Sequence, residues 1–333
     1  MIRTDVRGTD ALPIHAVIFS RDRAMQLDAA LASFSQHCAE AERVRIDVLY
    51  AATSPPFAKQ YELVESSWRR MLRLKLHRER DFRADLLRIL GADSRPSRVS
   101  PHHCTSLLRF LLQDTLSRGV STSGPPYVLF LVDDNIFYRP FSLVSATKAL
   151  EARPRAIGFS LRLGRNTTYC YALDSRQQTP HLSAVGDGVL AFDWTTAQCD
   201  FGYPLEVSSS VYRAPQMIRM LARLNFSNPN ALEGQLAGTA RRFWSHRAPE
   251  LLCLEQSVAF CNAVNKVQTV CDNRSGTKVE LSALELARRF ESGLRIDIHA
   301  FAGFTPDACH CTVPFSFIRD EARTTSTVRE ELT

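Results

Sequence analysis

An acidic pair that follows an apolar segment is the first feature of this sequence that could do chemistry. Residues 127–132 are rich in aromatic and β-branched side chains, which predicts a buried strand, and Asp133 and Asp134 come directly after them. Open α/β sheets bind their ligands at the carboxyl ends of their strands. Adjacent carboxylates repel each other unless a cation offsets their charge, and carboxylate oxygens suit Mg²⁺ or Mn²⁺. The pair therefore predicts a divalent-cation site, although a polar turn capped by Asp134 would also account for it.

The composition is that of a globular protein. The chain has 333 residues, of which 45% are hydrophobic and 23% charged, enough for one large or two modest cores. The net charge is +6, but the basic residues are dispersed, and we expect no nucleic-acid partner. No apolar run reaches the ~18 residues that a membrane-spanning helix needs, and no signal peptide opens the chain. The nine cysteines lack paired spacing, which favours reduced thiols in a cytoplasmic protein.

The densest basic segment, residues 68–78, alternates basic and apolar side chains. We expect it to form part of a long helix over residues 57–80, with one charged face. That face is most simply solvated. A basic helix could instead touch an anionic membrane surface, which would make the protein membrane-peripheral.

Strand and helix patterns alternate in the first part of the chain. Strands are predicted at residues 16–19, 46–50 and 127–132, and helices at residues 24–37, 57–80, 82–90 and 103–118. This alternation indicates an α/β fold in which helices flank a mostly parallel central sheet and the crossovers are right-handed.

The pattern becomes mixed after Asn135, which predicts an α+β C-terminal half. Helices are predicted at residues 143–152, 215–224, 230–244 and 284–292. Short strands are predicted at residues 156–163, 169–172, 189–194, 206–212, 251–254, 257–261, 295–299 and 313–318. No linker interrupts the chain, so we expect one continuous domain with flexible tails at residues 1–12 and 321–333.

Three motifs, in their order along the chain, resemble the GT-A fold of nucleotide-sugar glycosyltransferases. The first strand leads into Ser20-Arg21-Asp22-Arg23, and a later strand ends in Asp133-Asp134. A run of small residues at 208–215 then precedes Glu233, near the start of a helix. The sequence is similar to a bacterial-type branch of the family 2-like enzymes, whose first half is Rossmann-like. The resemblance implies that residues 13–140 bind the donor and that residues 141–320 bind the acceptor and perform catalysis.

The resemblance also implies an activity, which is the metal-dependent transfer of a sugar from a nucleotide sugar, with inversion. A UDP-sugar donor and Mn²⁺ or Mg²⁺ are favoured, and the acceptor would be a glycan, a lipid-linked glycan or a protein. A retaining mechanism stays open. So do two other classes: a nucleotidyltransferase, which would normally have a glycine-rich loop after the first strand, and a catalytically degenerate protein that binds a carbohydrate or nucleotide.

In the resembled fold the second Asp of the pair ligates the metal. Asp134 is therefore the expected ligand, and Asp133 the partner of the donor ribose or of a metal-bound water. His310 is expected to add a ligand from the C-terminal segment, with His299 as the second candidate. Either histidine could instead be half-buried on a strand. The cation would offset the charge that builds on the leaving diphosphate.

Inverting transfer needs a base for the acceptor hydroxyl. Glu233 is the first candidate, and Asp200 and Glu206 are the alternatives. Asn228 or Asn230 could cap the helix that contains Glu233, with Pro229 near its first turn, and Glu233 could then be a first-turn acid favoured by the helix dipole.

Basic side chains are expected at the donor. Arg21 and Arg23 would meet phosphate or uracil, and Asp22 would accept a hydrogen bond from the nucleobase or ribose. These three could instead be surface charges that cap the next helix. Arg162 and Arg213 follow short strands and would steady a diphosphate or an acidic sugar.

Overall fold

A nine-stranded sheet forms the centre of the protein. The computed structural model describes residues 11–92, 124–267, 274 and 278–320. The strand order is β3-β2-β1-β4-β11-β6-β12-β10-β9. In chain order the strands are β1 (Ile14–Arg21), β2 (Arg45–Ala51), β3 (Arg73–Arg78), β4 (Tyr127–Val132), β6 (Ala156–Ser160), β9 (Ser183–Gly186), β10 (Val189–Asp193), β11 (Ser209–Arg213) and β12 (Glu250–Leu254).

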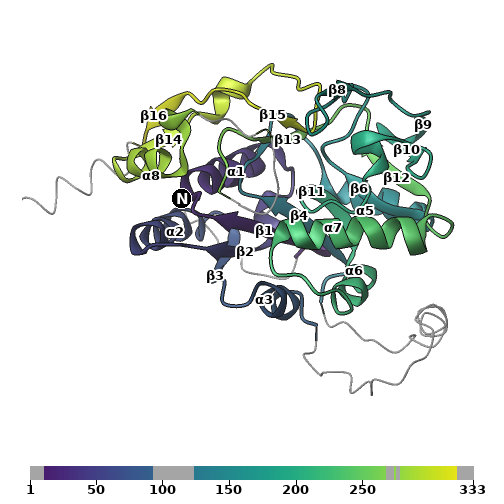
Figure 1. Ribbon diagram of the computed structural model, residues 1–333, viewed down its shortest axis with the longest axis horizontal. Helices are drawn as coiled ribbons and strands as arrows, with labels where there is room; N and C mark the ends of the chain where they lie inside the picture. The colour runs from purple at the N-terminus through teal and green to yellow at the C-terminus, as the bar shows by residue number, and fades with distance from the viewer. Residues whose placement is uncertain (1–10, 93–123, 268–273, 275–277, 321–333) are drawn as a thin grey trace, which may run out of the picture.

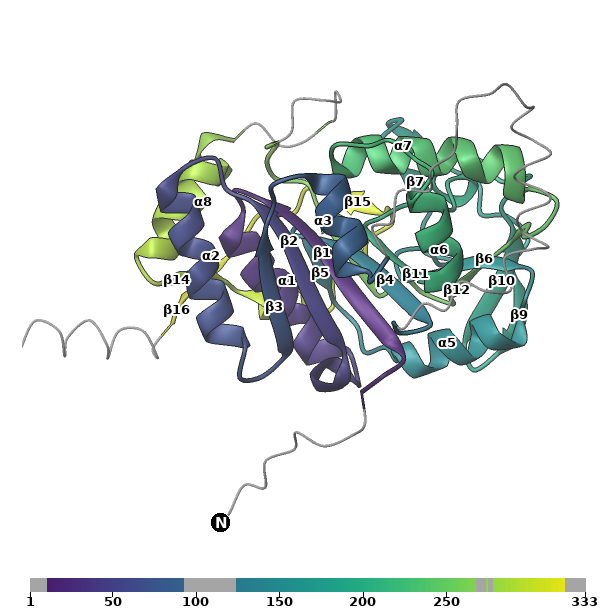
Figure 2. The same ribbon diagram turned by 90° about the horizontal axis from the view of Figure 1, so that it is seen from below.

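Most strands of this sheet run in one direction. β3, β2, β1 and β4 are parallel neighbours (Figure 2), and β6 is parallel to β12. β11 is antiparallel to both of its neighbours, and so is β10. All strands of the sheet except these two therefore point the same way. This confirms the α/β fold with a mostly parallel central sheet.

Helices cover both faces of the sheet and bury their apolar side chains in two cores, one on each face. On one side lie α1 (Ala24–His37), α2 (Pro55–Trp68), α5 (Leu143–Ala152) and α8 (Ala283–Glu291). On the other lie α3 (Phe82–Ile89), α6 (Ala214–Leu221) and α7 (Pro229–Thr239), which continues into a π-helical turn, η3 (Ala240–Trp244). Figure 1 shows α1 and α8 above the sheet and α3 and α6 below it. The short 3₁₀ turns are η1 (Ala41–Arg43), η2 (Cys199–Gly202), η4 (Val279–Leu281) and η5 (Ile298–Phe301).

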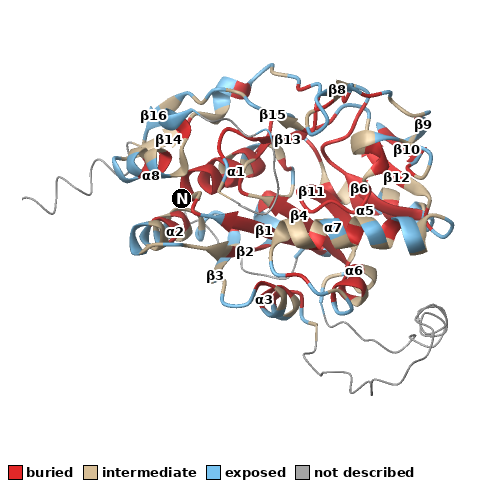
Figure 3. Cartoon of the chain, in the orientation of Figure 1, coloured by how far each residue is buried: buried red, intermediate tan, exposed pale blue. Residues whose placement is uncertain are grey.

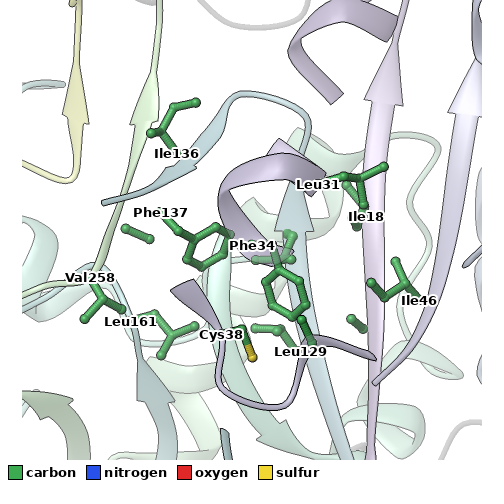
Figure 4. Packing of buried hydrophobic residues seen from close by; sticks show 14 of the residues in the cluster. Ile18, Leu31, Phe34, Cys38, Ile46, Leu129, Ile136, Phe137, Leu161 and Val258 are labelled. Carbon is green, nitrogen blue, oxygen red and sulfur yellow. The ribbon is translucent and has the colours of Figure 1, made fainter. Parts of the chain in front are cut away.

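Aromatic side chains of α1 and the sheet fill the first core. The rings of Phe34 and Phe137 pack edge to face with centroids 5.4 Å apart. Figure 4 shows them among Ile18, Ile46 and Leu129, which come from β1, β2 and β4. Burial is concentrated in the central strands and α1, whereas the outer sides of the other helices are exposed (Figure 3). The well-packed centre gives the strand ends a rigid support.

Three small sheets complete the fold. β5 (Asn135–Phe137), β13 (Ala259–Asn262) and β15 (His310–Cys311) form one of them, in the order β15-β13-β5. The other two pair β14 (Leu294–Ile296) with β16 (Phe317–Arg319), and β7 (Tyr169–Cys170) with β8 (Ser175–Arg176). The first small sheet matters most, because it places the C-terminal His310 near the segment that follows the acidic pair.

The prediction of one long helix over residues 57–80 is wrong beyond Trp68. α2 ends at Trp68, and Arg73–Arg78 form β3 at the edge of the sheet. The alternation of charged and apolar residues there has a period of two, so Leu74 and Leu76 pack on the core while Arg73 and Lys75 are exposed. Charged side chains on an edge strand also discourage pairing with other chains.

The basic helix on which a membrane contact could have been based is therefore not present. Residues 68–78 contain only the end of α2 and the edge strand β3. In the part of the chain that the structure describes, no helix is long and apolar enough to cross a bilayer.

Other predictions about elements and halves of the chain had different outcomes. α5 occupies residues 143–152 as predicted, but the helix predicted at residues 103–118 lies outside the described residues. The sheet takes strands from both 13–140 and 141–320, so the two halves share one framework. Their division into a donor half and an acceptor half stays a prediction.

Candidate active site

A cavity of about 360 Å³ opens at the carboxyl ends of β1 and β4. The order β3-β2-β1-β4 makes this a point where the direction of the crossovers reverses, and open α/β sheets bind ligands at such points. Six of the residues predicted for the site line the cavity: Arg21, Arg23, Asp133, Asp134, Glu233 and His310. The fold therefore brings together residues from both ends of the chain.

Asp133 is held in place by three donors. Its Oδ2 accepts hydrogen bonds from the Ser20 hydroxyl at 2.9 Å and from the Arg21 backbone N–H at 3.1 Å. Its Oδ1 accepts from Arg23 Nη1 at 3.1 Å. Asp133 is buried, with 4% of its surface exposed. It fastens the loop after β1 to the end of β4 and so positions that loop at the cavity.

Asp134 is the more accessible member of the acidic pair. Its side chain is 14% exposed and accepts a hydrogen bond from Arg23 Nη1 at 3.2 Å. Burial raises the pKa of Asp134 to about 6, a rise that Arg23 opposes and Asp133 reinforces. A cation close to Asp134 would favour its ionised form.

Asn135, the residue directly after the acidic pair, has a structural role. Its side-chain oxygen accepts a hydrogen bond from the Val132 backbone N–H at 2.8 Å and closes the turn that presents the acidic pair. Its Nδ2 donates to the Cys261 sulfur at 3.4 Å, and the residue is fully buried. The turn thus depends on an amide at this position.

β15 brings His310 to the cavity. His310 lies opposite Cys261 of β13, and β13 pairs with β5, directly after the acidic pair. The Asn262 backbone N–H donates to the Asp134 carbonyl at 2.8 Å, which joins this small sheet to the pair. Burial, assisted by the positive charge of Arg162, lowers the pKa of His310 to about 4. The ring is therefore neutral at pH 7, as a metal ligand must be. The second candidate, exposed His299 in η5, does not line the cavity.

The donor atoms at this end of the cavity suit a hard divalent cation, with one obstacle. Carboxylate oxygens are preferred by Mg²⁺ and Mn²⁺, and the neutral His310 adds a nitrogen. Among the described residues, however, no group of three or more His, Cys, Asp and Glu side chains is arranged to hold a metal. Both carboxylates instead face the guanidinium of Arg23. The pair fits a divalent cation once Arg23 has moved, and the ligand roles of Asp134, Asp133 and His310 stay predictions.

Glu233 lines the cavity from the second turn of α7, because it is the fifth residue of that helix. It is therefore not the first-turn acid that the sequence also allowed. Asn228 caps this helix by accepting a hydrogen bond from the Ala231 N–H at 2.9 Å, and Pro229 follows it as predicted. Glu233 Oε1 accepts from the Val207 N–H at 3.2 Å. Burial raises the pKa of Glu233 to about 7; Arg162 opposes the rise and the nearby Glu206 adds to it. A carboxylate with this pKa is suited to general-base catalysis at neutral pH.

Glu206 and Arg162 form a buried ion pair that does not line the cavity, with Arg162 Nε 3.7 Å from Glu206 Oε1. Glu206 Oε2 accepts hydrogen bonds from the Ser208 hydroxyl and backbone N–H, both at 2.5 Å, and Oε1 accepts from the Ser210 hydroxyl. Burial alone would raise the pKa of Glu206, but Arg162 and these donors hold it below its usual value. So placed, Glu206 is suited to orienting its surroundings, and we rank it below Glu233 as a base.

Asp200 also lies outside the cavity lining. It belongs to η2, where its Oδ2 accepts a hydrogen bond from Gln177 Nε2 at 3.2 Å and its backbone N–H donates to Gln177 Oε1 at 3.0 Å. Its charge is close enough to influence the pKa of His310 and Glu233. Its role as an alternative base stays a prediction with no contact in its favour.

Asp22 is turned away from the cavity. Its carboxylate accepts hydrogen bonds from the Thr53 backbone N–H at 2.8 Å and the Thr53 hydroxyl at 2.9 Å. Its backbone is left-handed, with φ of 53°. Asp22 thus joins the loops after β1 and β2, and its predicted contact with the nucleobase would require these bonds to break.

The predicted contact of Arg213 with the donor needs correction, because Arg213 lies at the opposite edge of the sheet. β11 runs antiparallel to β4, so Arg213 is opposite Tyr127, where β4 begins, whereas Asp133 follows the end of β4. Its guanidinium donates to the carbonyls of Leu150 and Arg153 at the end of α5 and to that of Ala156 at the start of β6. Arg213 therefore satisfies the C-terminus of a helix and is too far along the strand to reach the donor site.

Glu79 and Asn265 line the cavity but were not predicted from the sequence. Glu79 follows β3, and its N–H donates to the Tyr50 carbonyl at 2.8 Å. Its segment was expected to be helical, and only the two-residue period of β3 could have placed it at the sheet edge. Asn265 contributes a backbone carbonyl, which accepts from Arg23 Nη2 at 2.5 Å. A backbone contact of this kind leaves no signal in the sequence.

Comparison with known proteins gives a sequence relative and weak structural likenesses. No family model matches the sequence. It is similar to the bifunctional glycosyltransferase pgtA of Dictyostelium discoideum, with 23% identity over 286 residues. The match covers 78% of this chain and 33% of pgtA, so the chain spans about a third of the length of this curated relative.

Solved structures of similar arrangement include S. aureus TarS and the mannosyltransferase PcManGT of Pyrobaculum calidifontis, the latter in complex with GDP-Man and Mn²⁺. TarS is 11% identical, with a TM-score of 0.42, and the match covers 74% of this chain and 60% of that chain. PcManGT is 11% identical, with a TM-score of 0.35 and coverage of 67% and 51%. These likenesses are too weak to define the fold, which follows instead from the order and direction of the strands in the central sheet.

Proposed function

We propose that this protein is a glycosyltransferase that moves a sugar from a nucleotide sugar to an acceptor hydroxyl. The observation that carries the proposal is that the acidic pair and Glu233 line one cavity although they come from distant parts of the chain. Sugar transfer needs two such groups together, one at the donor diphosphate and one at the acceptor. The sequence similarity to pgtA supports the same class of reaction.

The donor would lie along the carboxyl ends of the parallel strands. Arg21 and Arg23 line this end of the cavity, and guanidinium groups suit phosphate oxygens. Asp133 holds the loop that carries both arginines. A divalent cation held by Asp134, with His310 and Asp133 close by, would stabilise negative charge on the leaving diphosphate as a Lewis acid. A UDP-sugar is the donor that the resemblance favours.

Glu233 would be the base in an inverting displacement. Its Oε1 is fixed by the Val207 N–H, and its pKa of about 7 leaves a large ionised fraction at neutral pH. An acceptor hydroxyl that donates its proton to Glu233 could attack the anomeric carbon from the side opposite the diphosphate. The product configuration would then be inverted.

Nucleotide binding and product release test the proposal. Melting temperatures would be measured with UDP, GDP, CDP and ADP, with and without Mn²⁺, because a ligand of the folded state alone raises the midpoint. Nucleotide sugars would then be assayed for release of nucleoside diphosphate. Glu233→Gln and Asp134→Asn should both suppress release. Failure of every nucleotide to bind would contradict the proposal, and release of pyrophosphate from a nucleoside triphosphate would favour a nucleotidyltransferase.

A further inference from the structure

One arginine of the chain already offsets part of the charge of the acidic pair. Arg23 Nη1 lies 3.1 Å from Asp133 Oδ1 and 3.2 Å from Asp134 Oδ2, so a single nitrogen bridges the two carboxylates. All three side chains are mostly buried, with exposed fractions of 11% for Arg23, 5% for Asp133 and 14% for Asp134. The bridging nitrogen stands where a cation shared by the two carboxylates would stand.

Arg23 is also fixed on its other sides. Its Nη2 donates to the Asn265 carbonyl at 2.5 Å, and its backbone N–H donates to the Tyr61 hydroxyl at 3.2 Å. Tyr61 is itself hydrogen-bonded to the Ser20 hydroxyl, which donates to Asp133. The guanidinium is therefore held by the Asn265 carbonyl as well as by the pair, and the Tyr61 hydroxyl fixes the backbone that carries it.

The charges make Arg23 and a divalent cation mutually exclusive at this position. Two carboxylates and one guanidinium leave a net charge of −1 in a largely buried environment, where charges interact more strongly than in water. A divalent cation would have to share the carboxylate oxygens that Arg23 now contacts, and the two positive groups would repel each other. Binding of the metal therefore requires Arg23 to leave the pair.

We propose that Arg23 is the resident counter-cation of Asp133 and Asp134 and competes with a divalent cation for them. In the free protein the arginine occupies the pair, so a metal ion alone binds weakly. Removal of the arginine charge exposes two adjacent carboxylates and turns the same position into a stronger metal site.

The test is titration of the metal-free protein with Mn²⁺ alone, followed by electron paramagnetic resonance or calorimetry. Arg23→Gln should bind one Mn²⁺ at least ~10-fold more tightly than the wild type, since it removes the competing cation. Adding Asp134→Asn to this variant should abolish the gain. No nucleotide is present, so the outcome is independent of the proposed transferase activity.

Arg21→Gln is the matched control. Arg21 lies in the same loop, lines the same cavity and loses the same charge, but only its backbone contacts Asp133. Its Mn²⁺ affinity should stay close to that of the wild type. An equal gain in both variants would show a general charge effect and overturn the proposal, as would equal Mn²⁺ affinities of the wild type and Arg23→Gln.

Loss of Arg23 also leaves two like charges close together, so the variant could unfold without metal. In that event Mn²⁺ should restore its circular dichroism spectrum and melting transition, because the ion takes over the neutralising role. A variant that Mn²⁺ does not refold would contradict the proposal.

Discussion

At the scale of single residues, the chemistry of the site depends on which carboxylates already have hydrogen-bond or ion-pair partners within the protein. Glu206 is buried and is bonded to Arg162 and to the serines that follow it. Glu233, its neighbour, has one backbone donor at the cavity wall and a pKa of about 7. Two acidic residues close together thus differ in what they can do, because only one of them has a carboxylate oxygen available to an acceptor.

Glu233→Gln should lower turnover by ~10²-fold or more while nucleotide affinity holds, because a carboxamide cannot accept the proton. The wild-type rate should rise with pH through about 7, the pKa of the group that must be ionised. The variant should lose this limb of the profile. Steady-state rates between pH 5.5 and 8.5 measure both effects, and an unchanged profile would move the search for the base to Asp200.

The same substitution has a defined effect on stability. The folded protein keeps the Glu233 proton up to about pH 7, whereas an unfolded chain loses it near ~4.3. Ionisation of Glu233 therefore costs stability as the pH rises between these values. At pH 8 the Gln variant should melt no lower than the wild type, which separates a lost base from a damaged fold.

Glu79 should influence which nucleobase binds. It lines the cavity where β3 ends and makes no side-chain hydrogen bond or ion pair within the described residues, and burial raises its pKa although Arg21 opposes the rise. The Glu79 carboxylate and the Arg21 guanidinium together match an N–H and the carbonyl next to it. Uracil and guanine share this pair of groups, and cytosine and adenine lack it.

We therefore expect Glu79→Gln to weaken UDP and GDP by ~10-fold, the equivalent of about 1.4 kcal/mol, and to leave CDP and ADP unchanged. Calorimetric titrations of the four nucleotides would measure this. Equal weakening of all four would show that Glu79 acts only on the shared diphosphate or on the fold.

At the scale of elements, strand direction decides which side chains can meet. β1 and β4 are parallel, so Arg23 and Asp133, which follow their ends, are neighbours. β11 is antiparallel to β4, so Arg213 at its end lies beside the start of β4. Position after a strand is therefore a site signal only when the direction of that strand is known.

Arg213→Ala should lower the free energy of unfolding by about 1–3 kcal/mol, because carbonyls at the end of α5 lose a charged donor. Nucleotide affinity should stay unchanged. Urea denaturation and nucleotide titration measure the two effects. A large loss of nucleotide affinity without a loss of stability would return Arg213 to the donor site.

The sequence could predict features that depend on local patterns, but not those that depend on contacts between distant segments. The strand that precedes Asp133, the bounds of α1 and α5, and a cap near the start of α7 were predictable, because periodicity and capping are local. β3 was missed because the charged residues among 73–78 were assigned to one face of a helix, although their period of two fits a strand. Arg213 could be excluded from the donor site only once the direction of β11 was known. The Arg23 bridge and the Asn265 carbonyl depend on contacts between distant segments, which no local pattern contains.

At the scale of the whole molecule, one sheet joins the two halves of the chain. β4 belongs to the first half and β11 to the second, and they pair along their length between the cavity and the opposite edge. The cavity takes Asp134 from one half and Glu233 from the other. Neither half can therefore form the complete site without the sheet that holds them together.

Because the sheet is continuous, we expect both halves to unfold together in urea. Trp68 of α2 reports on the first half, and buried Trp194 reports on the second. Variants that keep only Trp68 or only Trp194 of the chain's three tryptophans should show coincident fluorescence transitions, which is a test of a single cooperative unit. UDP at 100 times its Kd should stabilise both transitions equally, by about 2.7 kcal/mol, because the ligand binds only the complete site. Separate midpoints, or a shift confined to the Trp68 signal, would show instead that the donor site forms within the first half alone.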